Sequence, residues 1–228
     1  MSVLHPIPVR FDAILFDFDG VLIESEYAGN RHLSEYLTGI GHPTTLEQSM
    51  VNFMGRAGPD FHAALEQWIG GPIPDSFHEA RRIENERSMR DGVGEVAGAV
   101  AFVRSLPPGL PKAIVSSSGT AWIRRHLDHI GLADVFGDHI YSGREHVDRG
   151  KPAPDLYLYG AAKLGVAIER CAILEDSPVG ATGAVASGGH VIGMAAGRHC
   201  DPAHADRLRA IGVAAVAVDY AEAAQLIG

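Results

Sequence analysis

Two aspartates separated by one residue, Asp17 and Asp19, close a short apolar stretch near the start of the chain and are followed by Gly20. Carboxylates can act as nucleophiles, as general acids or bases, and as ligands of hard cations. Gly20 has no Cβ, so the chain can turn away sharply there without obstructing a bound anion. The spacing predicts a site in which Asp17 attacks an electrophile and Asp19 transfers protons.

Three later segments carry polar residues that could complete such a site. A serine-rich turn, 116–119, follows the apolar run 112–115, and the acidic pair Glu175 and Asp176 follows the apolar run 171–174. Between these two segments lies Lys151, directly before a proline. In open α/β sheets, ligands bind outside the carboxyl ends of the strands, so these side chains are expected to meet at one edge.

The charges of the four acidic residues indicate what the site binds. Two carboxylates ~4 Å apart repel by about 4 kcal/mol at an effective dielectric of ~20, so the group requires a cation. Oxygen ligands favour a hard ion, and we expect Mg²⁺ together with a phosphate group. Lys151 adds a positive charge, and Ser116 with the backbone N–H groups of its turn offers donors to phosphoryl oxygens. The combination predicts phosphoryl transfer through an aspartyl-phosphate on Asp17.

The elements that must position these residues are short strands alternating with amphipathic helices. The apolar runs are rich in Val, Ile and Ala and bounded by Gly, Pro or Asp, as expected for strands buried on both faces of a parallel sheet. They cover 11–18, 112–115, 171–174, 190–195 and 212–218. Helical periodicity covers 95–106, 121–130 and 156–164. The alternation predicts a doubly wound, Rossmann-like α/β domain.

One region interrupts the alternation. From residue 24 to residue 90, helical patterns separated by Gly and Pro replace the strands, at 27–37, 46–53, 60–68 and 76–89. We therefore predict a catalytic core made of residues 1–23 and 91–228, with a helical domain at 24–90 inserted after the first strand.

The amino-acid composition limits the kinds of protein that this chain could be. The chain has 228 residues, 46% hydrophobic and 21% charged, which is typical of a folded globular protein. A net charge of −9 argues against a general nucleic-acid binder. Two cysteines imply no disulfide framework, and no apolar run is long enough to cross a bilayer. We expect a cytoplasmic monomer, and we interpret the 12 scattered histidines as surface residues.

The candidate residues lie in four segments that resemble the motifs of the haloacid dehalogenase-like hydrolase superfamily, in the same order. These segments are Phe16–Glu26, Val115–Ser118, Gly150–Asp155 and Leu174–Gly180.

The resemblance implies a Rossmann-like core with a helical cap inserted after the first strand. It also implies Mg²⁺ held by the Asp17 carboxylate, the Asp19 backbone carbonyl and Asp176, with Glu175 as a ligand either directly or through water. We expect Asp17, Asp19, Ser116 and Lys151 to be catalytic.

The substrate is expected to be a small phosphorylated metabolite such as a sugar phosphate. Gly20 and Ser117 are the expected substrate-binding residues of the core. In the cap, a glycine-flanked turn could present Arg56 to the substrate.

Alternatives within the superfamily stay open. β-Phosphoglucomutases carry a histidine and an arginine at cap positions where this chain has Gly29 and Gly58, and a Lys-Asn pair where it has Gly119 and Thr120. These departures favour a phosphatase over a mutase. A dehalogenase would need neither Asp19 nor a metal, and a phosphonatase would need a cap lysine that 24–90 lacks. A non-catalytic phosphate-binding module is the alternative from another class.

Overall fold

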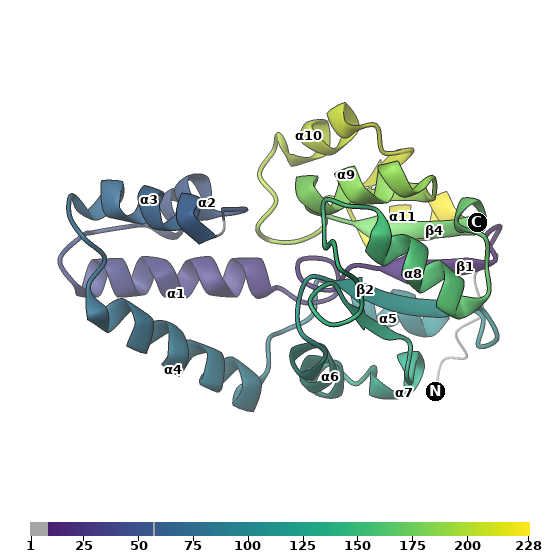
Figure 1. Cartoon of the computed structure of the whole chain (residues 1–228), viewed down its shortest axis with the longest axis horizontal. Coiled ribbons are helices and arrows are strands. Elements are labelled where there is room, and N and C mark those ends of the chain that lie inside the picture. The colour runs from purple at the N-terminus through teal and green to yellow at the C-terminus, as the bar shows by residue number, and fades with distance from the viewer. Residues whose placement is uncertain (1–8, 57) are drawn as a thin grey trace. The chain divides into compact units, whose positions relative to one another are not determined.

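The computed structural model describes residues 9–56 and 58–228. The chain divides into two compact units: one comprises the residues up to Glu24 together with Gly94–Gly228, and the other comprises Ser25–Val93 (Figure 1). We call the first unit the core and the second the cap.

The core is built on a six-stranded parallel sheet in the order β3-β2-β1-β4-β5-β6. Its strands are β1 (Ala13–Phe16), β2 (Lys112–Ser116), β3 (Ile140–Ser142), β4 (Cys171–Glu175), β5 (His190–Met194) and β6 (Ala215–Ala217). The chain crosses from one half of the sheet to the other between β3 and β4. The first strand therefore lies at the centre, paired with β2 on one side and β4 on the other.

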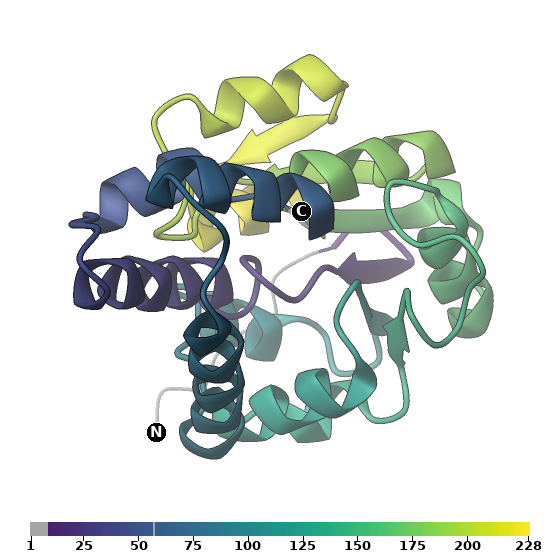
Figure 2. The same cartoon turned by 60° about the vertical axis from the view of Figure 1, so that its left-hand side comes forward.

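Helices cover both faces of this sheet (Figure 2). All four residues of β1 are fully buried, because alternate side chains enter opposite layers. On one face Leu15 packs in a cluster with Val115 and Tyr157. On the other, the ring of Phe16 meets those of Phe102 and Phe136 edge to face. The core helices are α5 (Ala99–Ser105), α6 (Thr120–His129), α7 (Ala133–Phe136), α8 (Asp155–Leu164), α9 (Pro178–Ser187), α10 (His204–Ile211) and α11 (Tyr220–Ile227), with a 3₁₀ turn η1 (Ile168–Arg170).

The cap consists of α1 (Ser25–Gly39), α2 (Leu46–Phe53), α3 (Gly58–Ile69) and α4 (Asp75–Asp91). Its own small apolar cluster joins residues from all four helices: Leu33, Leu37, Phe53, Leu65 and Phe77. Thr45 and Gln48 form a reciprocal capping box at the start of α2. The indole N–H of Trp68 donates to Oγ1 of Thr44 across 2.9 Å.

The two chain segments that join cap and core are paired with each other inside the core. Ile23 and Glu95 form an isolated antiparallel bridge. The N–H of Glu24 donates to the carbonyl of Gly94 across 2.9 Å, and the N–H of Val96 donates to the carbonyl of Leu22 across 3.0 Å. The insertion therefore begins and ends at one point.

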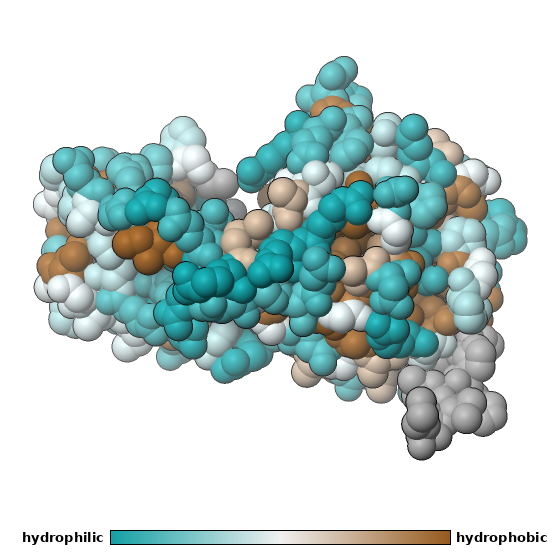
Figure 3. Space-filling model, turned by 90° about the horizontal axis from the view of Figure 1, so that it is seen from below, coloured by the Kyte–Doolittle hydropathy of each residue, from teal (hydrophilic) through white to brown (hydrophobic). Residues whose placement is uncertain are grey.

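The predicted fold class is confirmed, with one strand missed. β3 has three residues and lies at the edge of the sheet, so it produces too short an apolar pattern to stand out. The predicted insertion ran from residue 24 to residue 90, and the cap occupies Ser25–Val93. Of the helices in the described residues, none has both the length and the apolar character to cross a bilayer. Hydrophilic residues cover most of the face in Figure 3, and hydrophobic ones form small groups.

Candidate active site

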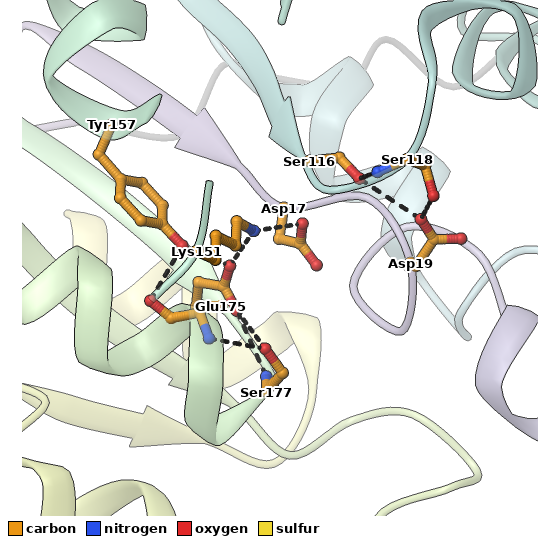
Figure 4. Close-up of polar contacts among 9 residues, drawn as sticks. Asp17, Asp19, Ser116, Ser118, Lys151, Tyr157, Glu175 and Ser177 are labelled. Carbon is orange, nitrogen blue, oxygen red and sulfur yellow. Dashed lines mark hydrogen bonds and ion pairs between the residues drawn. The ribbon is translucent and has the colours of Figure 1, made fainter. Parts of the chain in front are cut away.

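The carboxyl ends of β1, β2 and β4 bring the candidate residues together (Figure 4). β1 and β4 pair in register up to Phe16 and Leu174, so the residues after each strand emerge side by side. The N–H of Asp17 donates to the carbonyl of Leu174 across 2.9 Å, which continues the ladder into the site. The site is thus fixed by backbone pairing at the centre of the sheet.

Lys151 is the cation of this site. Its Nζ lies 2.6 Å from Oδ1 of Asp17 and also donates to Oε1 of Glu175. The lysine side chain is 4% exposed, so both ion pairs are shielded from water. Burial lowers the pKa of Lys151, but the carboxylates of Asp17 and Glu175 outweigh it and hold that pKa well above its ordinary value. The two carboxylates therefore favour the charged form of Lys151.

The surroundings of Asp17 favour its neutral form. Burial, and next the negative charge of Glu175, raise the pKa of Asp17 well above the usual range, while Lys151 opposes the rise. One oxygen each of Asp17, Glu175 and Asp176 lie within 4.8 Å of one another, and all three residues are buried. When all three are ionised, these carboxylates carry more negative charge than one ammonium balances, and their oxygens are the donor type that Mg²⁺ prefers. The residues fit such an ion.

Glu175 is held on both of its oxygens. Oε1 accepts from Lys151 and lies 2.7 Å from the hydroxyl of Tyr157, while Oε2 accepts from the backbone N–H and hydroxyl of Ser177 at 3.3 and 3.2 Å. The same Ser177 hydroxyl caps α9 by accepting from the N–H of Gly180 at 3.0 Å. A Cβ on Gly180 would lie 2.2 Å from the Glu175 carboxylate, so only glycine lets the helix approach this closely.

Asp19 faces a different set of partners. Its Oδ2 accepts from the hydroxyl of Ser118 at 2.6 Å and lies 3.4 Å from that of Ser116. Its Oδ1 accepts from the indole N–H of Trp122 at 3.1 Å. The hydroxyl of Ser116 in turn accepts from the N–H of Ser118 at 3.0 Å. The serine turn and the start of α6 therefore hold the Asp19 carboxylate.

Three further predicted residues, which were expected to bind the substrate, have different surroundings. Gly20 adopts φ +79°, in the region that favours glycine, and a Cβ there would lie 2.0 Å from Oδ2 of Asp176. Ser117 is exposed. In the cap, the guanidinium of Arg56 pairs with Asp60 at 2.9 Å and donates to the carbonyl of Asn52 at 2.7 Å.

Sequence reasoning missed several residues that touch the site. Trp122 lies in none of the four motif segments, yet its indole N–H donates to Asp19. The surface interpretation of the histidines is wrong for His126, His199 and His204, which are buried. His199 Nε2 lies 2.9 Å from Oδ2 of Asp176. The close sequence spacing of His199, Cys200 and His204 was the signal available.

Comparison with known proteins places this geometry in a family. Residues 11–188 match the family model of haloacid dehalogenase-like hydrolases. Hexitol phosphatase A of Escherichia coli is 32% identical over 207 residues, which span 89% of each protein.

Two solved structures agree with this. A conserved haloacid dehalogenase-like protein of Agrobacterium tumefaciens superposes with a TM-score of 0.85 at 35% identity, covering 95% of this chain and 97% of the other. A hydrolase of the same family from Deinococcus radiodurans, solved with phosphate and sodium bound, gives a TM-score of 0.81 at 33% identity, covering 96% and 99%. The motif resemblance is thereby confirmed: the chain belongs to the haloacid dehalogenase-like hydrolases and is an enzyme of their phosphatase group.

Proposed function

We propose that this enzyme is a Mg²⁺-dependent phosphatase that hydrolyses a small sugar phosphate through an aspartyl-phosphate on Asp17. The observation that carries the proposal is the buried ion pair between Asp17 and Lys151, 2.6 Å long, at the sheet edge where Glu175 and Asp176 also emerge. A nucleophile, a fixed cation and an excess of carboxylate oxygens suit attack on a phosphorus centre.

Asp17, the Asp19 backbone carbonyl and Asp176 are the groups we assign to Mg²⁺. Such an ion, when bound, neutralises charge on the phosphoryl group. Glu175 has both oxygens engaged by Lys151, Tyr157 and Ser177. We therefore assign Glu175 to holding Lys151 in place and not to contacting the ion directly.

In the first half-reaction a carboxylate oxygen of Asp17 forms a bond to phosphorus as the bond to the alkoxide oxygen of the substrate breaks. Asp19, in its acid form, gives its proton to that leaving oxygen. Lys151 favours the ionised form of Asp17, because a cation 2.6 Å from the carboxylate opposes its protonation. The Ser116 hydroxyl and the turn after it are the donors we assign to the phosphoryl oxygens.

In the second half-reaction the ionised Asp19 accepts a proton from water, and the water oxygen attacks phosphorus. The bond from phosphorus to Asp17 breaks, which releases inorganic phosphate and restores both aspartates. Proton transfer of this kind is worth roughly 10²–10⁴ in rate.

The substrate class is inferred from relatives. A relative that is 32% identical across 89% of the chain is a hexitol phosphatase. We infer a phosphorylated sugar or sugar alcohol, with Gly20, Ser117 and Arg56 among the residues that contact it.

The test is a screen of sugar and polyol phosphates for phosphate release, with Mg²⁺ and with a chelator. We expect chelation to abolish turnover, and Asp17→Asn to abolish it with Mg²⁺ present. Asp12→Asn is the matched control, because Asp12 is exposed at the other end of β1 and pairs with Arg170. Rapid quenching followed by mass spectrometry should find the phosphoryl group on the peptide that contains Asp17.

Two outcomes would overturn the proposal. Turnover that survives chelation would exclude the Mg²⁺-dependent mechanism. Isomer formation from a hexose 1-phosphate in the presence of its 1,6-bisphosphate, without phosphate release, would show a mutase instead.

A further inference from the structure

Two buried histidines contact Asp176, one at its side chain and the other at its backbone carbonyl. His199 Nε2 lies 2.9 Å from the side-chain oxygen Oδ2, and His204 Nε2 lies 2.8 Å from the backbone carbonyl. Both histidines are 3% exposed and Asp176 is 2% exposed. They come from the segment after β5 and the first turn of α10, far from Asp176 in the sequence.

The direction of the His204 hydrogen bond follows from its second ring nitrogen. Nδ1 lies 3.2 Å from Nη2 of Arg207, and a guanidinium can only donate, so Nδ1 accepts. The proton of His204 is therefore on Nε2, where it is donated to the Asp176 carbonyl. Arg207 is itself held by both oxygens of Asp201, at 3.1 and 3.0 Å. A directed chain of hydrogen bonds thus runs from the surface to the backbone of Asp176.

The backbone on either side of His199 leaves room for its ring. A Cβ on Gly20 would lie 2.0 Å from Oδ2 of Asp176 and 3.0 Å from Cε1 of His199. A Cβ on Gly197 would lie 2.4 Å from Nδ1 of His199. Real Cβ atoms do not approach other atoms this closely, so any larger residue at either position would displace the imidazole or the carboxylate.

We propose that His199 and His204 are positioning residues that hold Asp176 as a ligand of Mg²⁺. This inference rests on the proposed function, which assigns Asp176 to the ion. A carboxylate bonded through Oδ2 cannot rotate about its Cβ–Cγ bond without losing that contact, and the second bond fixes the main chain from which it projects. Partners of this kind are typically worth 10- to 100-fold in metal affinity.

The same segment suggests a competing interpretation. Ligand atoms of His199, Cys200 and His204 lie within 4.8 Å of one another, which could suit a thiophilic ion such as Zn²⁺. However, both nitrogens of His204 already have partners, and Nε2 of His199 is bonded to Asp176. A metal there would have to break these contacts, so the positioning role explains the arrangement better.

The experiment measures the Mg²⁺ dissociation constant by calorimetry, alongside kcat at saturating Mg²⁺. His199→Ala should raise the dissociation constant about 10- to 100-fold and change kcat at saturation by less than about threefold. His199→Gln keeps an N–H in reach of Oδ2 and should stay within about threefold of the wild type. An unchanged constant in His199→Ala, or equal damage from the glutamine, would overturn the inference.

A second pair of variants keeps the test valid if His199→Ala does not fold. Arg207→Met removes the exposed end of the chain that orients His204 and should weaken Mg²⁺ binding roughly 2- to 10-fold. Arg209→Met is the matched control, because Arg209 lies on the same helix and pairs with Asp206 instead. Equal constants for these two variants would argue against the His204 link.

The variant Asp176→Asn distinguishes a failure of the proposed Mg²⁺ site from a failure of the positioning role of the histidines. If Asp176→Asn binds Mg²⁺ as tightly as the wild type does, the assignment of Asp176 to the ion is wrong. The positioning role of the histidines then fails as well. If Asp176→Asn abolishes binding while the histidine variants bind normally, only the positioning role fails. A thiolate charge-transfer band on adding Co²⁺, absent in Cys200→Ser, would replace the positioning role with a soft-metal site.

Discussion

The indole N–H of Trp122 donates to Oδ1 of Asp19 across 3.1 Å, although the two residues are 103 positions apart in the chain. The bond links the first turn of α6 to the residue that we propose as the general acid and base. Together with the Ser118 hydroxyl at 2.6 Å, it gives each oxygen of Asp19 a donor.

Trp122→Phe should lower kcat about 2- to 10-fold, because it removes one of the hydrogen bonds that orient Asp19 while keeping an aromatic ring. Mg²⁺ affinity should stay unchanged. Steady-state kinetics at saturating Mg²⁺ would measure the effect. Trp68→Phe removes an indole bond to Thr44 inside the cap and should reduce stability without a comparable loss of kcat. A Trp122→Phe enzyme as fast as the wild type would show that Asp19 does not depend on this bond.

Lys151→Met should reduce kcat roughly 10²–10³-fold, since it removes a fixed cation from a water-poor site. It should also lower Tm in the presence of chelator, because removing one partner of a buried ion pair costs about 3–5 kcal/mol. Calorimetry and steady-state assays would test the two effects. Lys163→Met is the control. Lys163 is an exposed residue of α8, the helix that follows Lys151, and its ammonium lies over the Tyr159 ring. Normal turnover in Lys151→Met would exclude the role we assign.

Gly180→Ala should be strongly destabilising and should impair turnover. The new methyl group would lie 2.2 Å from the Glu175 carboxylate, so the start of α9 or the carboxylate must move. Gly29→Ala is a contrasting control, because no atom beyond the neighbouring residues and backbone of its own helix lies within 4 Å of a Cβ there. Alanine favours a helix by up to about 1 kcal/mol over glycine, so Gly29→Ala should raise Tm. Equal Tm values for the two variants would contradict the packing argument.

We expect the buried phenol of Tyr220 to make the protein less stable at alkaline pH. Burial raises the pKa of this phenol well above its usual value of 10.0, and its hydroxyl donates to the carbonyl of Val21 at 2.5 Å. Above pH ~10 the unfolded chain releases this proton while the folded chain keeps it, so the free energy of unfolding falls as pH rises, by up to about 1.4 kcal/mol per pH unit. Tyr220→Phe should be less stable at neutral pH but show a shallower alkaline decline. Urea denaturation across pH 8–11 would measure both slopes, and parallel slopes would refute the prediction.

The site residues that directly follow an apolar run could be predicted from the sequence. Asp17, Asp19 and Glu175 each follow an apolar run long enough to identify a buried strand, and a parallel sheet brings such ends to one edge. Whether each of them acts as proposed remains a prediction.

The contacts that complete the site were not readable, because they join distant segments. Nothing around Tyr157 indicates that its hydroxyl lies against Glu175, since the contact depends on where α8 packs on the sheet. His199 and His204 resemble surface histidines until the loop after β5 is folded against Asp176. Trp122 has the spacing of an ordinary helix packing residue, and only its indole N–H distinguishes its role.

The bridge between Ile23 and Glu95 closes the core at the point where the inserted helices leave it and return. Because the N–H of Glu24 is already bonded to the carbonyl of Gly94, a short turn can join these two residues without separating the two segments. A foreign helical segment spliced at these two residues would meet the same anchor. Such chimaeras would exchange a whole module while the strands that carry the reaction centre stay unchanged.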